Sequence, residues 1–349
     1  MRICMMNDHF YRSSGAAMAI RRIAQALTDM DYCVAGCMND GRLEDLSWVS
    51  DQRFERFDLK SPNPVRVARE LRRFKRWLKL QGCDLVHCHH RRISVLLHLA
   101  GVPVLYTGQL AFKYAVWFRW LHPPGMTAIT PSVASNILET TGRKVLACIS
   151  NPAQFPKHPP QIDVSEVRHR AVCVARLEPV KGHTFLLAAW KLLLDRGLRY
   201  ELLLVGEGSA RPQLEEQVRR DGLQELVQFS GFQTDVLSVM SKALFAILVS
   251  KLEGQGIVTL EAAAMGRASL LTAVHGSIDL LPPNRKLPNG IEYGKVQELA
   301  DALKEWFERP DDVIQEGERF FAFLKNSSDP YEIAGEYKAV YQRILAGHA

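Results

Sequence analysis

Two glutamates on either side of a short glycine-containing turn are the residues whose types and spacing point most directly to chemistry. Glu253 and Glu261 enclose the turn, which contains Gly254 and Gly256. An apolar run over residues 243–249 precedes it and a helix-forming run follows, so the pattern predicts a strand, a turn and a helix. Glycine lets the backbone approach a ligand closely, and the free N–H groups at the start of a helix point at that ligand. The stretch therefore predicts a ligand site.

The spacing of the two glutamates decides where each one lies. On one continuous helix, residues eight positions apart are roughly 80° out of phase. We therefore place Glu253 in the loop and Glu261 on the helix, with both side chains facing one cleft. The elements that position them are a buried strand over 243–249 and a helix over 256–266.

Three segments at predicted strand ends share a resemblance to one family. Besides the Glu-x7-Glu stretch, residues 174–183 contain the spacing Arg-x4-Lys-Gly, with Arg176 and Lys181, and the segments 204–208 and 229–232 end two further strands. Together they resemble retaining glycosyltransferases of family 4, which have two Rossmann-like domains and the GT-B fold. The resemblance covers the C-terminal half almost continuously and the N-terminal half more loosely. It implies an α/β fold in which two Rossmann-like domains with parallel sheets face each other across a cleft.

The resemblance also implies a role for each matching residue. Arg176 and Lys181 would stabilise the departing diphosphate without a metal, Glu253 would lie near the sugar, and Glu261 would bind the ribose hydroxyls. An arginine fork and a lysine point charge both suit phosphate oxygens. The remaining donor contacts would come from the backbone of Gly254, Gly256, Ile257 and Val258, with Gly231 and Phe232 beside the base. The alternative for each charged group is a surface salt bridge or an exposed helix-terminus charge.

The first strand and loop of the chain open a Rossmann-like unit but lack the dinucleotide fingerprint. Residues 2–6 predict a buried strand and residues 16–30 a helix, and Gly15 is the one glycine in the loop between them. The family resemblance implies that Gly15 lies near the donor diphosphate. The alternative is that it eases a turn.

A histidine-rich strand end marks the predicted acceptor and sugar side. Residues 84–90 contain His87, His89 and His90, with spacing that fits no common structural zinc site, so we expect no metal. We expect His87 to be partly buried, and the resemblance places His89 and His90 at the cleft. Gln109 stands where the family commonly has a histidine near the transferred sugar, and glutamine can bind a hydroxyl but cannot titrate.

Composition limits the class of protein. At 349 residues the chain is long enough for two domains, and no apolar run approaches the ~20 residues of a membrane span. The start of the chain turns polar too soon for a signal peptide. Seven cysteines without a regular framework predict reduced thiols and a cytoplasmic location. Residues 1–155 carry 21 Lys and Arg against 12 Asp and Glu, which suggests contact with an anionic surface, and no nucleic-acid motif is recognised.

The excess positive charge is concentrated in one predicted helix over residues 64–82. Within it, seven basic residues face one acid, and apolar residues recur at helical spacing. We expect residues 65–79 to bind the anionic inner-membrane surface, with a solvated face on an ordinary crossover helix as the alternative.

Domain boundaries follow from composition. We expect a first domain over 1–155, a proline-rich linker over 156–168, a nucleotide-sugar-binding domain over 169–328, and a last helix over 329–349, centred on 331–345, that crosses back to the first domain. In the second domain, strands are expected at 171–176, 200–205, 226–230, 243–249 and 268–272. Helices are expected at 182–196, 210–221 and 256–266.

The predicted function is metal-independent, retaining transfer of a sugar from a nucleotide-sugar donor to a glycan or lipid-linked acceptor. The donor is a UDP- or GDP-sugar and a substrate rather than a cofactor. The setting is surface polysaccharide or lipopolysaccharide biosynthesis at the cytoplasmic side of the inner membrane. Alternatives are a nucleotide-sugar epimerase on the same scaffold and a non-catalytic glycan- or membrane-binding module. A nicotinamide dehydrogenase is disfavoured because the fingerprint is absent.

Overall fold

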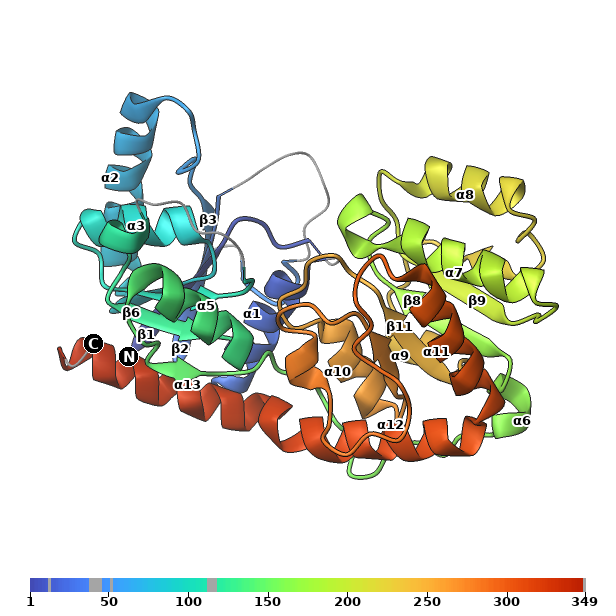
Figure 1. Cartoon of the computed structure of the whole chain (residues 1–349). Helices are drawn as coiled ribbons and strands as arrows, with labels where there is room; N and C mark the ends of the chain where they lie inside the picture. Colours follow the sequence, from blue (N-terminus) through green and yellow to red (C-terminus); the bar gives the residue numbers. More distant parts are fainter. Residues whose placement is uncertain (12–13, 38–45, 51–52, 112–117, 348–349) are drawn as a thin grey trace. The chain divides into compact units, whose positions relative to one another are not determined.

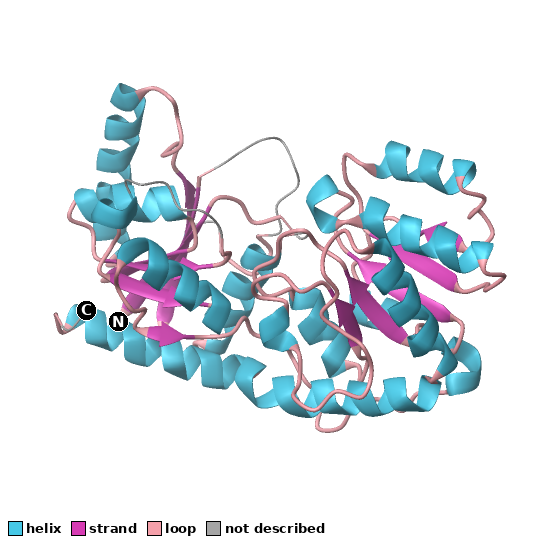
Figure 2. Ribbon diagram, viewed as in Figure 1, coloured by secondary structure: helices cyan, strands magenta, loops and turns pink. Residues whose placement is uncertain are grey.

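The structure is a computed structural model that describes residues 1–11, 14–37, 46–50, 53–111 and 118–347. The chain divides into two compact units (Figure 1). The N-terminal unit comprises Met1–Pro152 and Asp329–Ala349, and the C-terminal unit comprises Ala153–Ser328. Each contains a parallel β-sheet with helices packed around it, which confirms the predicted α/β class with two parallel sheets (Figure 2).

The sheet of the N-terminal unit has the strand order β3-β2-β1-β4-β5-β6-β7, and every described pairing is parallel. The strands are β1 (Arg2–Asn7), β2 (Asp31–Gly36), β3 (Phe54–Arg56), β4 (Leu85–Cys88), β5 (Val104–Gly108), β6 (Gly125–Ala128) and β7 (Ala147–Cys148). The helices are α1 (Gly15–Ala26), α2 (Pro64–Gln81), α3 (Arg91–Leu99), α4 (Phe118–Leu121), α5 (Pro131–Thr141) and α13 (Pro330–Leu345). The order reverses between β1 and β4, and such a switch point is where open parallel sheets bind ligands.

Both faces of this sheet are covered, as expected for parallel strands. Alternate residues of β1 enter different buried clusters: Ile3 and Met5 pack with residues of α1 and α13, whereas Cys4 and Met6 pack with residues of α2 and α3. The apolar strand residues thus account for a core on each side. The predicted helix over 16–30 is too long, because α1 ends at Ala26 and a turn closed by the Met30 N–H to Leu27 O bond (3.1 Å) leads into β2.

Helix α13 is held to the N-terminal unit by a buried polar chain. His87 on β4 is fully buried, and its Nδ1 lies 2.8 Å from the Tyr341 hydroxyl while its Nε2 lies 2.7 Å from Thr107 Oγ1. Tyr337 and Tyr341 are both fully buried side chains of α13. His87 is therefore more deeply buried than expected, because a helix about 250 positions later in the chain covers it. Both of its nitrogens have partners, so it serves the structure.

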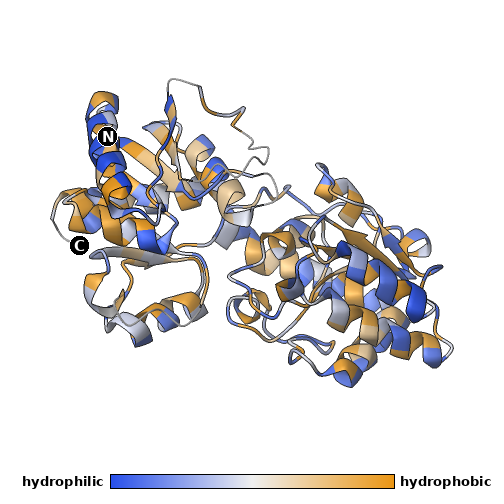
Figure 3. Cartoon of the chain, turned by 90° about the horizontal axis from the view of Figure 1, so that it is seen from above, coloured by the Kyte–Doolittle hydropathy of each residue, from blue (hydrophilic) through white to orange (hydrophobic). Residues whose placement is uncertain are grey.

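The C-terminal unit repeats the arrangement with the strand order β10-β9-β8-β11-β12. Its strands are β8 (Arg170–Val174), β9 (Glu201–Val205), β10 (Val227–Phe229), β11 (Phe245–Leu248) and β12 (Ser269–Leu271). Figure 3 colours these strands mostly orange, for hydrophobic residues. The helices are α6 (Val164–Val167), α7 (His183–Asp195), α8 (Arg211–Arg220), α9 (Val236–Met240), α10 (Ile257–Ala264), α11 (Val296–Glu308) and α12 (Pro310–Lys325), with 3-10 turns η2 (Pro179–Lys181), η3 (Ile278–Leu280) and η4 (Asn326–Ser328). Here the order reverses between β8 and β11.

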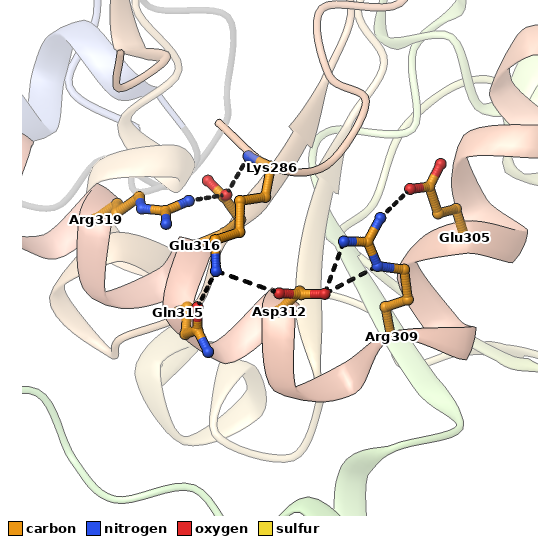
Figure 4. A network of polar contacts seen from close by, with 7 residues as sticks. All are labelled: Lys286, Glu305, Arg309, Asp312, Gln315, Glu316 and Arg319. Carbon is orange, nitrogen blue, oxygen red and sulfur yellow. Dashed lines mark hydrogen bonds and ion pairs between the residues drawn. The ribbon is translucent and has the colours of Figure 1, made fainter. Parts of the chain in front are cut away.

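A polar network fixes α12, the helix that packs against α10. Glu316 is buried and accepts hydrogen bonds from the Lys286 backbone N–H (2.7 Å) and from Arg319 (Figure 4). Arg309 bridges Asp312 and Glu305 in the same network. Gly317 of α12 lies so close to the turn that follows α10 that an added Cβ would overlap the Gly266 carbonyl oxygen. The network thus fixes α12, which packs against the helix that carries Glu261.

Candidate functional site

The carboxyl ends of β8 and β11 bring the main candidate residues to one edge of the C-terminal sheet. Arg176 and Lys181 follow β8, and the loop from Ser250 to Gly256 follows β11. These two strands are neighbours and parallel, and they flank the switch point of the sheet. Sequence motifs far apart in the chain therefore converge on one edge.

Lys181 and Glu253 form the central contact of this edge. Lys181 Nζ lies 2.6 Å from Glu253 Oε2, and the side chains are only 18% and 12% exposed. Ser250 Oγ donates to the same carboxylate oxygen at 3.2 Å, and the Gly254 N–H donates to the other at 3.1 Å. The carboxylate is thus fixed by three groups, and a cation is held beside it. Water is largely excluded, so the charges act more strongly here than on the surface.

Arg176 is not drawn into that contact. Its side chain is exposed in the loop after β8, and within the described part of the chain no carboxylate pairs with it. Glu261 lies on α10 and is half-buried, as the spacing predicted. The structure thus joins Lys181 to Glu253 and leaves Arg176 with its guanidinium in solvent.

Two glycines bring the loops of this edge together. Gly182 has φ +75°, and a Cβ there would overlap the Val249 carbonyl oxygen. Gly276 has φ +84°, and a Cβ there would overlap the Gly254 carbonyl oxygen. Gly276 was not among the predicted site residues, although a glycine a few residues beyond a strand end is a signal that could have drawn attention to it. Both positions require glycine for conformation and for space.

The start of α10 lies at the same edge of the sheet. Gly256 caps the helix with φ +69° and no side-chain hydrogen bond, and Ile257 and Val258 are its first two residues. The first N–H groups of a helix have no partner within the helix and favour anions. The predicted cradle of Gly254, Gly256, Ile257 and Val258 is therefore a turn followed directly by a helix N-terminus.

The remaining donor-side candidates are more peripheral. Gly231 has φ +65°, and its carbonyl oxygen accepts from the Gly206 N–H at 2.8 Å, which ties the ends of β9 and β10 together. Phe232 beside it is 46% exposed. Gly15 belongs to the N-terminal unit, where it is the first residue of α1 after the capping Ser14.

The N-terminal unit places its polar candidates at the ends of β4 and β5. Gln109 Nε2 lies 2.8 Å from His89 Nδ1, and burial lowers the pKa of His89 to about 3. His90 caps α3 by accepting from the Ile93 N–H at 3.4 Å, and its Nε2 lies 3.7 Å from Asp8. Burial is the main cause that lowers the pKa of His90. Asp8 was missed by the sequence analysis because nothing in its own neighbourhood marks it.

Residues 168–309 match the family model described as glycosyl transferases group 1. This segment contains Arg176, Lys181, Glu253 and Glu261. The match covers most of the C-terminal unit, Ala153–Ser328.

Several known proteins are similar to this chain. The alpha-D-kanosaminyltransferase of Streptomyces kanamyceticus is 30% identical over 142 residues, which cover 40% of this chain and 36% of that protein. Alr3699/HepE of Anabaena, crystallised with UDP and glucose, superposes with a TM-score of 0.78 at 17% identity over 97% of this chain and 99% of that one. The lipopolysaccharide outer core galactosyltransferase WaaB superposes with a TM-score of 0.72 at 18% identity over 97% and 100%.

These findings confirm part of what the sequence predicts. The fold matches GT-B neighbours across nearly the whole chain, and the family match and relatives support the prediction of an enzyme of the nucleotide-sugar glycosyltransferase class. The alignments with curated relatives span only 26% to 59% of those proteins.

None of the helices in the described part of the chain has the length and apolar character needed to cross a bilayer. The described residues also contain no group of three or more His, Cys, Asp or Glu side chains that could hold a metal ion.

Proposed function

We propose that the protein is a retaining, metal-independent glycosyltransferase of family 4 that transfers a sugar from a nucleotide-sugar donor to a glycan or lipid-linked acceptor. The observation that carries the proposal is the Lys181–Glu253 contact of 2.6 Å, at the switch point of the sheet in the segment that matches the group 1 glycosyl transferase model. This contact places a cation that can bind phosphate and a carboxylate that can bind sugar hydroxyls beside a helix N-terminus. The combination suits a sugar diphosphate.

The reaction leaves an electron pair on the diphosphate when its oxygen separates from the anomeric carbon. Lys181 and Arg176 stabilise this charge, together with the N–H groups at the start of α10. The acceptor hydroxyl oxygen bonds to the anomeric carbon on the face that the diphosphate leaves, and its proton passes to the departing phosphate oxygen. Glu253 orients the sugar, and Glu261 binds the ribose hydroxyls. Gly231 and Phe232 lie beside the base.

A donor screen tests this proposal. We expect one member of a panel of UDP-, GDP- and ADP-sugars to raise the unfolding temperature, with UDP favoured because HepE was crystallised with UDP. Glu261→Ala and Arg176→Ala should bind that donor at least roughly tenfold more weakly. Glu298→Ala, which removes an exposed acid from α11, is the matched control. Equal donor binding by all variants would contradict the assignment, and conversion of the donor alone into another sugar nucleotide would indicate an epimerase.

We propose that the acceptor is membrane-associated, because helix α2 has the features of a membrane-binding surface. Arg69, Arg72, Arg76 and Lys79 recur at helical spacing on one exposed stripe, and no carboxylate among the described residues pairs with any of them. Val65 and Leu80 at the ends of the same stripe are 76% and 78% exposed. The flanking Arg66 and Arg73 are neutralised by Asp58, Glu55 and Glu70.

This stripe favours an anionic lipid surface over a merely solvated face. Its unpaired charges attract headgroups, and the terminal Val65 and Leu80 can enter the interface. Together with the likeness to WaaB, it supports a lipid-linked acceptor in surface polysaccharide or lipopolysaccharide biosynthesis, at the cytoplasmic side of the inner membrane.

Neutralising the stripe should release the protein from anionic vesicles. The variant with Arg69, Arg72, Arg76 and Lys79 all changed to Gln is expected to bind mixed phosphatidylcholine–phosphatidylglycerol vesicles at least roughly a hundredfold more weakly, at about 1 kcal/mol per charge. Co-sedimentation measures this. The matched control removes the same charge from the exposed surface of the C-terminal unit, at Arg168, Arg219, Lys242 and Lys304. Equal weakening by both variants, or none by the first, would remove the proposed surface.

A further inference from the structure

Five of the seven cysteines lie in one apolar cluster of the N-terminal unit, where its sheet packs with helices α2 and α3. They are Cys4, Cys33, Cys37, Cys83 and Cys88. The register of β1 and β2 places Cys4 beside Cys33, so these two thiols share one face of the sheet. Neither the donor site nor the proposed membrane surface uses any of the five.

Two of these thiols are in direct contact. Cys33 Sγ lies 3.0 Å from Cys83 Sγ, and both residues are free cysteines. Cys33 comes from β2, whereas Cys83 directly follows Gly82, the left-handed residue that ends α2. The Cys83 N–H donates to Leu78 O at 3.0 Å, which fixes Cys83 to the last turn of that helix. Since a disulfide bond is about 2.0 Å long, an approach of about 1 Å would join the two sulfurs.

The two thiols differ in access. Cys33 is fully buried and Cys83 is half-buried, so a reagent from solution reaches Cys83 first. The hydrogen bond with Cys33 is the main cause that raises the pKa of Cys83, and the one with Cys4 is the main cause that raises the pKa of Cys33. Arg2 faces both thiols and opposes these shifts, whereas Asp84 adds to the shift at Cys83. Because only the thiolate attacks, the pair reacts slowly at neutral pH.

We propose that Cys33 and Cys83 are a redox-active pair that closes to an intramolecular disulfide when the protein meets a small disulfide oxidant such as oxidised glutathione. The Cys83 thiolate attacks one sulfur of the oxidant, whose S–S bond breaks and releases one glutathione. The Cys33 thiolate then attacks the Cys83 sulfur of the mixed disulfide and releases the second glutathione. The two cysteines lose two electrons and two protons, which the two released glutathione molecules carry. The proposal does not depend on the proposed function.

The bond would connect two elements that are far apart in the chain. Cys33 and Cys83 are 50 positions apart, and the closed loop would contain β3 and all of α2. It would tie the C-terminal end of α2 to β2. A cross-link of this span restricts the unfolded chain far more than the folded one, in which the sulfurs are already in contact. The oxidised protein should therefore resist unfolding better than the reduced protein.

Peptide mapping of the full chain tests the pair. The wild type is equilibrated with mixtures of reduced and oxidised glutathione, free thiols are blocked after acid quenching, and the digest is analysed by mass spectrometry. We expect a linked peptide that contains Cys33 and Cys83, two hydrogen atoms lighter than its reduced parts, to become the main form in the oxidising mixture. Dithiothreitol should reverse it. The unfolding temperature of the linked form should be higher by about 4 °C or more.

Four variants assign the effect to this pair. Cys33→Ala and Cys83→Ser should lose both the linked peptide and the rise in unfolding temperature. Cys148→Ser, which changes an exposed cysteine of the same unit, should keep both. Cys4→Ala should also keep the linked peptide, which excludes a pairing through the thiol next to Cys33.

The wild type alone decides the proposal, so a variant that fails to fold does not obscure the result. Absence of the linked peptide at equilibrium, a glutathione adduct on Cys83 as the end product, or a bond from either residue to Cys4 would overturn it. A bond between two copies of the chain, seen as a dimer on a non-reducing gel, would overturn it as well. A linked form with an unchanged unfolding temperature would refute the stabilising effect.

Discussion

Replacing Lys181 with alanine lowers the rate of sugar transfer by roughly 10²- to 10³-fold, because the departing diphosphate loses a preorganised cation. The ammonium is only 18% exposed and already held beside Glu253, so little reorganisation is needed when charge develops. The effect should appear mainly in kcat, since the charge on the diphosphate increases as the bond breaks. Single-turnover transfer from the donor identified in the screen measures it.

The matched control for this change is Lys191→Ala. Lys191 lies on α7, ten residues further along, and pairs with Asp195 on the exposed surface. Such a pair contributes well under ~1 kcal/mol, and its loss should leave transfer unchanged. Activity of Lys181→Ala close to wild type would contradict the assigned role. Loss of wild-type activity on chelation with recovery on adding manganese would contradict metal independence as well.

The fold could largely be predicted from the sequence, because local residue patterns mark most of the strands and helices. Apolar runs bounded by polar or glycine-containing loops mark strands such as β11 and β12 within two residues of their observed ends. The exception, helix α1, ends four residues early at Ala26, since the turn through Met30 is needed to start β2 in register. That requirement comes from the sheet and cannot be seen in the helical pattern.

The candidate site is predictable only in part, for the same reason. Motif spacing identifies Lys181 and Glu253, but their mutual contact joins residues 72 positions apart and requires the neighbouring order of β8 and β11. Asp8 has no motif at all, and its contact with Lys60 joins residues 52 positions apart. Burial of His87 depends on Tyr341, 254 positions away. Contacts of this kind arise from topology, which periodicity does not specify.

Replacing Gly276 with alanine is expected to have the second large effect, on the shape of the donor loop rather than on its charges. With φ +84° the residue lies where an L side chain costs about 1–2 kcal/mol, and an added Cβ would overlap the Gly254 carbonyl oxygen. Backbone cannot rotate away as a side chain can, so the Glu253–Gly254 turn must shift. Since Glu253 takes a hydrogen bond from the Gly254 N–H, its carboxylate moves with it. Displacements of about 1 Å at a reacting group cost on the order of 100-fold in rate.

Gly222→Ala separates the two contributions to this prediction. Gly222 has φ +71° but nothing within 4 Å of an added Cβ, so the change introduces backbone strain without a collision. Both variants should lower the unfolding temperature, while only Gly276→Ala should weaken donor binding and slow transfer. If the two variants bind the donor equally well, the close approach of Gly276 to Gly254 does not shape the site. If Gly276→Ala binds poorly at an unfolding temperature matching that of Gly222→Ala, the loss arises from the geometry of the turn, and the loop around Glu253 is confirmed as a rigid part of the donor site.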